Sequence, residues 1–189
     1  IKNMQSTQIS LFEKQIDKLE KQKSALEDLH DFTMQMIKDE LNAKKELIQE
    51  ENGLAIACDG DRVVAYAMAG SWEYWSAWPL FQHMIKDLPN TEYLGQVLSM
   101  ENSYQYGPIC IHKDYRGTEV LPNIFEFSRT QMNKRYPILI TFINQINPRS
   151  LKAHTEKLGL EIIKPFEFNN NQYYELGYDM SKKTKGSTV

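Results

Sequence analysis

Residues 106–127, YGPICIHKDYRGTEVLPNIFEF, and residues 137–160, PILITFINQINPRSLKAHTEKLGL, contain the pattern that decides the fold. Ile109 and Ile111 alternate as in a strand, while Leu121, Ile124 and Phe125 recur at helical spacing. Residues 138–143 are apolar on both faces and rich in β-branched side chains, which is typical of a central parallel strand. The order strand, turn, helix, buried strand and second helix therefore predicts a mixed α/β domain.

The turn at Arg116 and Gly117 is predicted to face a phosphate group. A strand that leads through a tight turn into a helix presents the free N–H groups of the first helical turn and the positive end of the helix dipole. Pro122 fits such a first turn, because its missing N–H has no intrahelical use there. Asn147 and His154 then follow on the second predicted helix.

These two stretches resemble the GNAT N-acetyltransferase superfamily, and the resemblance covers about the last two thirds of the chain. The resemblance implies a mixed α+β fold of the acyl-CoA N-acyltransferase type, with N-terminal helices and a central mixed sheet splayed between its fourth and fifth strands. It also implies transfer of an acetyl group from acetyl-CoA to the primary amine of a small molecule or peptide. The four histidines of the sequence are widely separated and show no metal-ligand spacing, so no metal is expected.

The same resemblance assigns the residues that bind acetyl-CoA. They are Ile109, Cys110 and Ile111 on the strand, Arg116, Gly117, Thr118, Glu119, Val120 and Leu121 in the turn, and Asn147 and Ser150 on the later helix. The family's turn is R-G-x-G-x-G/A, whereas Glu119 and Leu121 replace two of its glycines here. The alternative is a catalytically silent module of this fold that acts as a binding or protein-interaction domain.

Amine acylation needs groups that move protons. An alkylamine is protonated near neutrality, so a base must remove a proton before the nitrogen attacks. Glu73 is the first candidate in sequence order and Glu101 the second, and the alternative for both is a solvated loop carboxylate. His154 follows Asn147 where the family commonly has Tyr, which implies that it protonates the leaving thiolate. The alternative is a surface histidine.

Residues 70–105 form an unusually long connection, which is predicted to lie on the acceptor side. Its tryptophans, together with two tyrosines on the following strand, give an aromatic wall for the acceptor as one interpretation. The residues of this wall are Trp72, Trp75, Tyr104 and Tyr106. The alternative is that the tryptophans are core residues of an inserted helix.

The rest of the chain is predicted to complete one domain over residues 1–180, with a disordered tail at 181–189. Residues 10–51 read as helices whose apolar seam either packs on the sheet or forms a dimerising coil. Residues 54–58 and 63–69 read as a hairpin, and residues 160–168 and 172–180 as a second one.

Composition excludes several classes of function. The formal net charge of -3 gives no electrostatic footprint for nucleic acid. Cys58 and Cys110 lie in apolar runs and are predicted to be small buried residues rather than a disulfide or a metal pair. We find neither an apolar stretch long enough for a membrane span nor a signal-peptide pattern, so we expect a cytoplasmic protein without a membrane partner.

Overall fold

The computed structural model describes residues 18–23 and 48–184. The chain divides into two compact units, Ile1–Lys45 and Glu46–Val189. In the first unit, residues 18–23 are helical and Leu19 is exposed. The remainder of the predicted apolar seam lies outside the described residues. No helix of the described part of the chain is long and apolar enough to cross a membrane.

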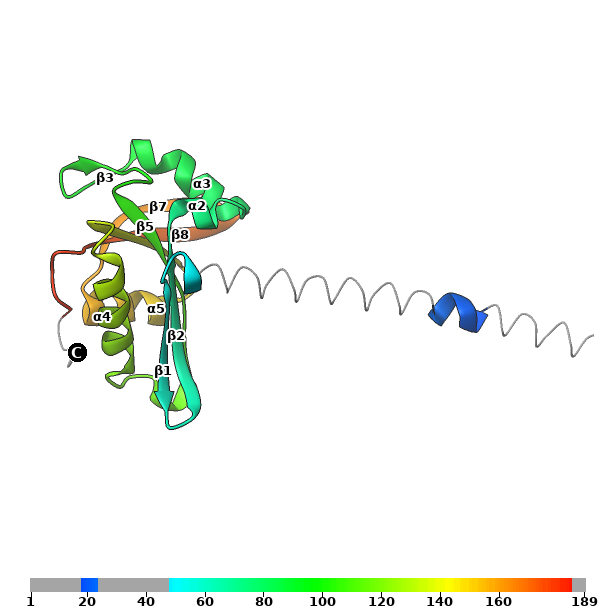
Figure 1. The fold of residues 1–189 in the computed structure, drawn as a ribbon. Coiled ribbons are helices and arrows are strands. Elements are labelled where there is room, and N and C mark those ends of the chain that lie inside the picture. Colours follow the sequence, from blue (N-terminus) through cyan, green and yellow to red (C-terminus); the bar gives the residue numbers. More distant parts are fainter. Residues whose placement is uncertain (1–17, 24–47, 185–189) are drawn as a thin grey trace, which may run out of the picture. The chain divides into compact units, whose positions relative to one another are not determined.

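A six-stranded sheet forms the centre of the second unit, with the strand order β1-β2-β5-β6-β8-β7 (Figure 1). The strands are β1 (Leu54–Asp59), β2 (Arg62–Gly70), β5 (Ser103–Ile111), β6 (Ile138–Asn144), β7 (Glu161–Phe168) and β8 (Asn171–Asp179). β5 and β6 are parallel, and the other neighbouring strands are antiparallel. The predicted mixed sheet, both predicted hairpins and the central parallel strand are confirmed.

Helices lie on both faces of this sheet (Figure 1). α4 (Val120–Met132) packs against β1 and β2, and α5 (Pro148–Lys152) continues into a π-helix, η3 (Ala153–Leu158). The long connection after β2 holds α2 (Trp72–Trp75), α3 (Pro79–Asp87), a 3₁₀ turn (Leu88–Asn90) and the short strands β3 (Glu92–Tyr93) and β4 (Gln96–Val97). A second 3₁₀ turn (Lys113–Tyr115) follows β5.

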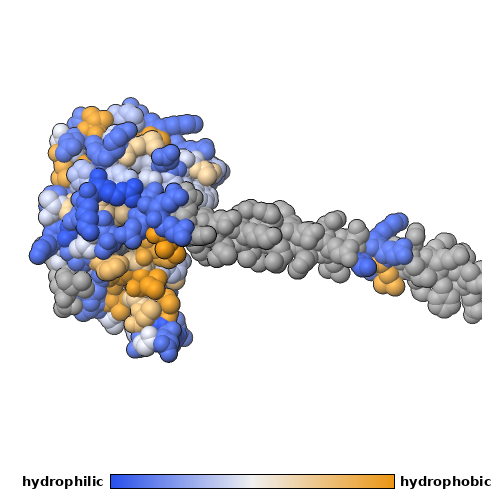
Figure 2. Space-filling model, in the orientation of Figure 1, coloured by the Kyte–Doolittle hydropathy of each residue, from blue (hydrophilic) through white to orange (hydrophobic). Residues whose placement is uncertain are grey.

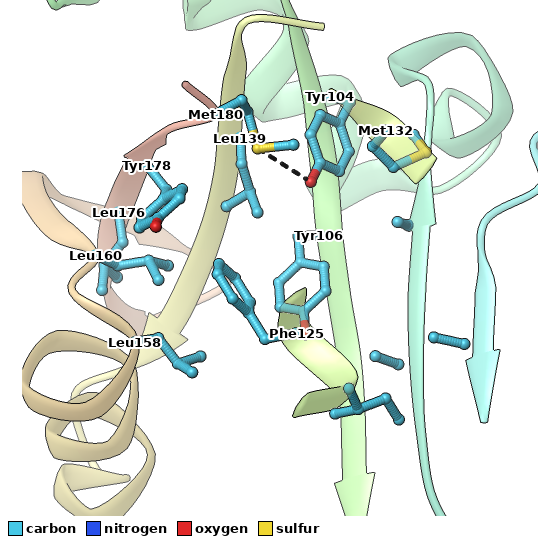
Figure 3. Packing of buried hydrophobic residues seen from close by; sticks show 14 of the residues in the cluster. Tyr104, Tyr106, Phe125, Met132, Leu139, Leu158, Leu160, Leu176, Tyr178 and Met180 are labelled. Atoms are coloured by element: carbon cyan, nitrogen blue, oxygen red, sulfur yellow. Dashed lines mark hydrogen bonds between the residues drawn. The ribbon is translucent and has the colours of Figure 1, made fainter. Parts of the chain in front are cut away.

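Strand alternation divides the buried apolar residues into two clusters, one on each face of the sheet. Tyr104 and Tyr106 of β5 pack with Phe125 of α4 on the first face (Figure 3), where the Tyr104 hydroxyl donates to Met180 Sδ at 3.6 Å. Trp72 packs in the second cluster, under α3. Because Trp72 and Tyr104 are both 0 % exposed, the aromatic wall predicted from them is instead core.

Cys58 and Cys110 are exposed, so the prediction that they are buried is wrong. They pair in register with Val63 and Tyr66, on strands that alternate between a covered and an uncovered face. Apolar side chains gather on this part of the surface, over the β1–β2 hairpin (Figure 2). The apolar runs around these cysteines therefore did not indicate whether a side chain lies on the face that α4 covers or on the opposite, exposed face.

The segment after β8 is anchored more firmly than the sequence predicted. Thr184 is buried, and its hydroxyl donates to the Glu126 carboxylate at 2.7 Å. Arg129 holds the same carboxylate with two hydrogen bonds, and these partners keep the pKa of Glu126 at about 2. These contacts hold the chain as far as Thr184, and the rest of the tail predicted to be disordered, residues 185–189, lies outside the described residues.

The β5–β6 ladder ends early, and the two strands separate. Pairing runs from Ser103↔Ile138 to Gln105↔Ile140 and stops there. Beyond it the carbonyl oxygen of Tyr106 accepts hydrogen bonds from Thr141 Oγ1 at 2.6 Å and from Gln105 Nε2 at 2.8 Å. Two side chains therefore satisfy a buried carbonyl that has lost its neighbouring strand.

This arrangement gives a stability test. Thr141→Val keeps the shape of the side chain but removes the hydroxyl that donates to the Tyr106 carbonyl. We expect the free energy of unfolding in urea to fall by about 1 to 2 kcal/mol, the usual effect of removing one buried hydrogen bond. Thr130→Val removes a hydroxyl from an exposed hydrogen bond on α4 and should change the free energy of unfolding by less than about 0.5 kcal/mol. Equal effects would contradict the bracing role of Thr141.

Candidate functional site

The separation of β5 and β6 opens a cavity of about 470 Å³ between the end of β5, the Arg116–Leu121 turn and the α5–η3 helix. It is lined by Ile109, Cys110, Ile111, Arg116, Gly117, Leu121, Asn147, Arg149, Ser150, Lys152, Ala153, His154, Glu156 and Lys157. The lining brings together residues that the sequence placed on a strand, a turn and a later helix. Thr118, Glu119 and Val120 belong to the same turn but do not line the cavity.

The turn at Arg116 and Gly117 is tied to both neighbouring elements. Arg116 Nε donates to the carbonyl oxygen of Ile111 at 3.0 Å, and Lys157 Nζ donates to that of Gly117 at 3.4 Å. Gly117 has a φ of +86°, a left-handed conformation that favours glycine. The glycine is therefore required by the backbone of the turn.

The two residues that replace family glycines have different positions. Glu119 is exposed, and its carboxylate lies outside the cavity lining. Leu121 does line the cavity and also packs in the core cluster under α4. Some of the backbone donors of this helix end are already used, since the N–H of Val120 donates to Thr118 Oγ1 and that of Asn123 to the carbonyl oxygen of Glu119.

Cationic side chains surround the cavity. Arg116, Arg149, Lys152 and Lys157 line it, against the single lining carboxylate of Glu156. Such a surplus of positive charge favours an anionic ligand, and a phosphate group in particular. Sequence reasoning missed Arg149, Lys152 and Lys157, although their spacing after Asn147 places them on one helix.

Asn147 starts the helix that carries these residues. Its side-chain oxygen accepts the N–H of Ser150 at 3.1 Å, the usual N-cap hydrogen bond. Asn147 and Ser150 both line the cavity, and the cap also sets the direction in which α5 leaves β6.

His154 is 8 % exposed and lies where the helix widens into η3. Its Nδ1 is 2.8 Å from the carbonyl oxygen of Ser150. A carbonyl oxygen only accepts, so Nδ1 carries the proton, and in the neutral ring Nε2 has a free lone pair. Burial lowers the pKa of His154 below its ordinary value, although the hydrogen bond to Ser150 opposes this shift.

A second cavity, of about 220 Å³, lies on the other side of His154. It is lined by Phe81, Gln105, Tyr106, Gly107, Pro108, Ile109, Thr141, Phe142, Ile143, Ser150 and His154. Ile109, Ser150 and His154 line both cavities, so the buried imidazole stands where the two meet. Sequence reasoning missed Phe81, Gln105 and Phe142; the polar Gln105 within an apolar strand was the available signal.

The other predicted site residues lie elsewhere. Glu73 is an exposed residue of α2, and neither it nor Glu101 lines either cavity. Trp75 packs edge-on against Tyr74 and, like Trp72, lies outside both linings. Tyr106 does line the smaller cavity. Among the described residues, no group of three or more His, Cys, Asp or Glu side chains could hold a metal ion.

Comparison of the fold with solved structures gives several similar proteins. An N-acetyltransferase from Staphylococcus aureus Mu50 aligns with 75% of this chain and 76% of its own, at 17% identity and a TM-score of 0.50. A ribosomal-protein-alanine N-acetyltransferase from Brucella melitensis aligns with 74% and 77%, at 15% identity and a TM-score of 0.47. BjaI, a CoA-dependent acyl-homoserine lactone synthase, aligns with 67% of this chain at 12% identity and a TM-score of 0.47.

The chain spans 57% of the length of that synthase. No protein-family model matches the sequence, and the comparison with curated proteins gave no match. At such low sequence identities the likeness concerns the fold alone. The evidence for it is the alignment with the Staphylococcus aureus acetyltransferase. The splayed β5–β6 pair, the turn into α4 and the closing hairpin agree with that likeness: the chain has the GNAT acyl-CoA N-acyltransferase fold.

Proposed function

We propose that this protein transfers an acetyl group from acetyl-CoA to an amine. One observation carries the proposal: a cavity lined by cationic side chains meets a second, less charged cavity at a buried histidine. A two-substrate transfer needs this arrangement, because the donor and the acceptor must reach one reacting carbon from different sides. The residues that line the cavities fit an acyl-CoA donor in three respects.

The first respect is charge. Arg116, Arg149, Lys152 and Lys157 suit the phosphate groups of the donor, and they offset the weaker backbone cradle left by Glu119 and Leu121. The second is the edge of β5. Past Gln105 this edge has no β6 partner, so residues 109–111 offer backbone groups to an amide-containing arm and an N–H to the developing oxyanion.

The third respect is the proton path through His154. The acceptor nitrogen forms a bond to the thioester carbonyl carbon and loses a proton to His154 Nε2. The carbon–sulfur bond then breaks, and His154 returns that proton to the thiolate sulfur. The Nδ1–H bond to Ser150 makes Nε2 a base first and an acid afterwards, so this proposal extends the role predicted from the sequence. It also replaces Glu73, which does not line either cavity, as the base.

His154→Ala tests the proton path. We expect kcat to fall by about a hundredfold or more, with little change in acetyl-CoA affinity, because general acid–base catalysis contributes about that factor. Thiol release measures kcat, and calorimetry measures affinity. His83→Ala removes an exposed histidine that lines neither cavity and should be neutral. Unchanged turnover in His154→Ala would remove His154 from the mechanism.

The pH profile gives a second readout of the same residue. Burial lowers the pKa of His154, so the imidazole stays neutral to lower pH than an exposed histidine does, and the acidic limb of kcat/KM should lie below the pH at which an ordinary histidine titrates. This acidic limb should be absent from the residual activity of His154→Ala. An unchanged limb in the variant would assign the titration to another group.

Arg149→Gln tests the cationic lining. Loss of one partly screened charge should weaken acetyl-CoA binding by about threefold to tenfold, and added salt should weaken it in the parent protein. Lys134→Gln removes an exposed charge that lies outside both cavities and should leave the affinity unchanged. If the parent binds no CoA thioester at millimolar concentration in calorimetry, the enzyme proposal fails and the catalytically silent module is the function that is left.

A further inference from the structure

The smaller cavity carries an inference about the acceptor, which rests on the proposed function. We infer that this cavity binds an amine that is uncharged at neutral pH and attached to a flat apolar group, such as an arylamine, and that Gln105 Oε1 accepts a hydrogen bond from its N–H. The inference assigns a substrate class and a specificity residue to the cavity. Three observations lead to it.

The first observation is an unpaired acceptor. Gln105 is 1 % exposed, and its Nε2 donates to the carbonyl oxygen of Tyr106 at 2.8 Å. That carbonyl only accepts, so the bond fixes which end of the amide is nitrogen. The opposite end, Oε1, is buried and has no hydrogen-bond partner among the described residues. A buried acceptor of this kind is unfavourable unless a donor reaches it, and an amine N–H in the adjoining cavity is such a donor.

The second observation is the shape and chemistry of the walls. Phe81 and Phe142 approach each other with their ring centroids 5.9 Å apart, and Pro108 and Ile143 line the same cavity. The hydroxyl of Thr141 is already committed to the Tyr106 carbonyl. Besides Gln105 Oε1, His154 Nε2 is free at the junction with the larger cavity, and the lining residue Tyr106 has a buried hydroxyl without a hydrogen-bond partner among the described residues. Largely apolar walls with so few polar groups favour a flat apolar body that carries a single polar substituent.

The third observation is charge. The lining contains no Asp or Glu within residues 48–184, the part of the second unit that the structure describes. Glu175 lies opposite Phe142 in the sheet but is buried beside Lys164, with Nζ and Oε2 at 3.6 Å. An alkylammonium ion would therefore lose its water without gaining a counter-ion, which is costly. An uncharged amine avoids this cost, and it needs no deprotonation before it attacks, which suits a buried imidazole of lowered basicity.

Two isomeric amines provide the experiment. In 4-methylaniline the nitrogen is bonded to the ring and the amine is uncharged at pH 7. Benzylamine has the same molecular formula, but its nitrogen is bonded to a CH2 group and is protonated at pH 7. With acetyl-CoA and the full chain, we expect kcat/KM at pH 7 to be at least about tenfold higher for 4-methylaniline. A preference for benzylamine would overturn the inference.

Gln105→Glu tests the specificity residue with an isosteric change. A carboxylate at this position supplies the missing counter-ion, so the preference should shift towards benzylamine by about tenfold or more relative to the parent. Gln96→Glu adds the same charge on an exposed residue of β4 outside both cavities and should leave the preference unchanged. An unchanged preference in a folded Gln105→Glu protein would overturn the role of Gln105. The comparison of the two amines in the parent decides the substrate class even if this variant does not fold.

Further outcomes separate this inference from the proposed function. Faster reaction with hexanoyl-CoA than with acetyl-CoA would assign the smaller cavity to the acyl chain and overturn the acceptor assignment. Acetyl-CoA binding with transfer to benzylamine alone would leave the acyltransferase intact and overturn only the amine class. Absence of both acetyl-CoA binding and thiol release would overturn the acyltransferase, and the acceptor assignment with it.

Discussion

The architecture of the candidate site depends on how one carbonyl group, that of Tyr106, is satisfied. Two parallel strands separate only if the backbone groups at the point of separation find other partners. Thr141 Oγ1 and Gln105 Nε2 are those partners here, and they come from the two strands that part. Both cavities open beyond this point, and the edge of β5 that faces them is unpaired because its ladder with β6 has ended.

Local patterns predicted most of the fold. Residues 138–143 read correctly as a central parallel strand because both faces of β6 are buried, and glycine and asparagine marked the hairpin turns. Patterns could not show which face of a strand a helix covers, so the predicted burial of Cys58 and Cys110 was wrong. The prediction that Trp72 belongs to an aromatic wall was wrong for a related reason. Its indole N–H donates to buried Ser103, a partner that only the tertiary structure brings near.

The part of the candidate site that is built from residues close together in the sequence could be predicted. Gly117, Asn147 and His154 belong to one continuous stretch of strand, turn and helix, so local order placed them together. The smaller cavity combines Phe81 from the long connection with Gln105 and Phe142 from two strands. No spacing along the chain signals that combination. The character of His154 likewise comes from its surroundings, because burial and one carbonyl group set its basicity and its tautomer.

The bracing of the Tyr106 carbonyl also bears on the kinetics of ligand association. Both donors belong to the chain itself, so a ligand does not have to break a β5–β6 ladder in order to enter. For the proposed acyl-CoA donor, association should then be governed by diffusion and by attraction to the cationic side chains that line the larger cavity, without a slow opening step. Differences in affinity among related ligands should consequently appear in their residence times, while their rates of entry remain similar.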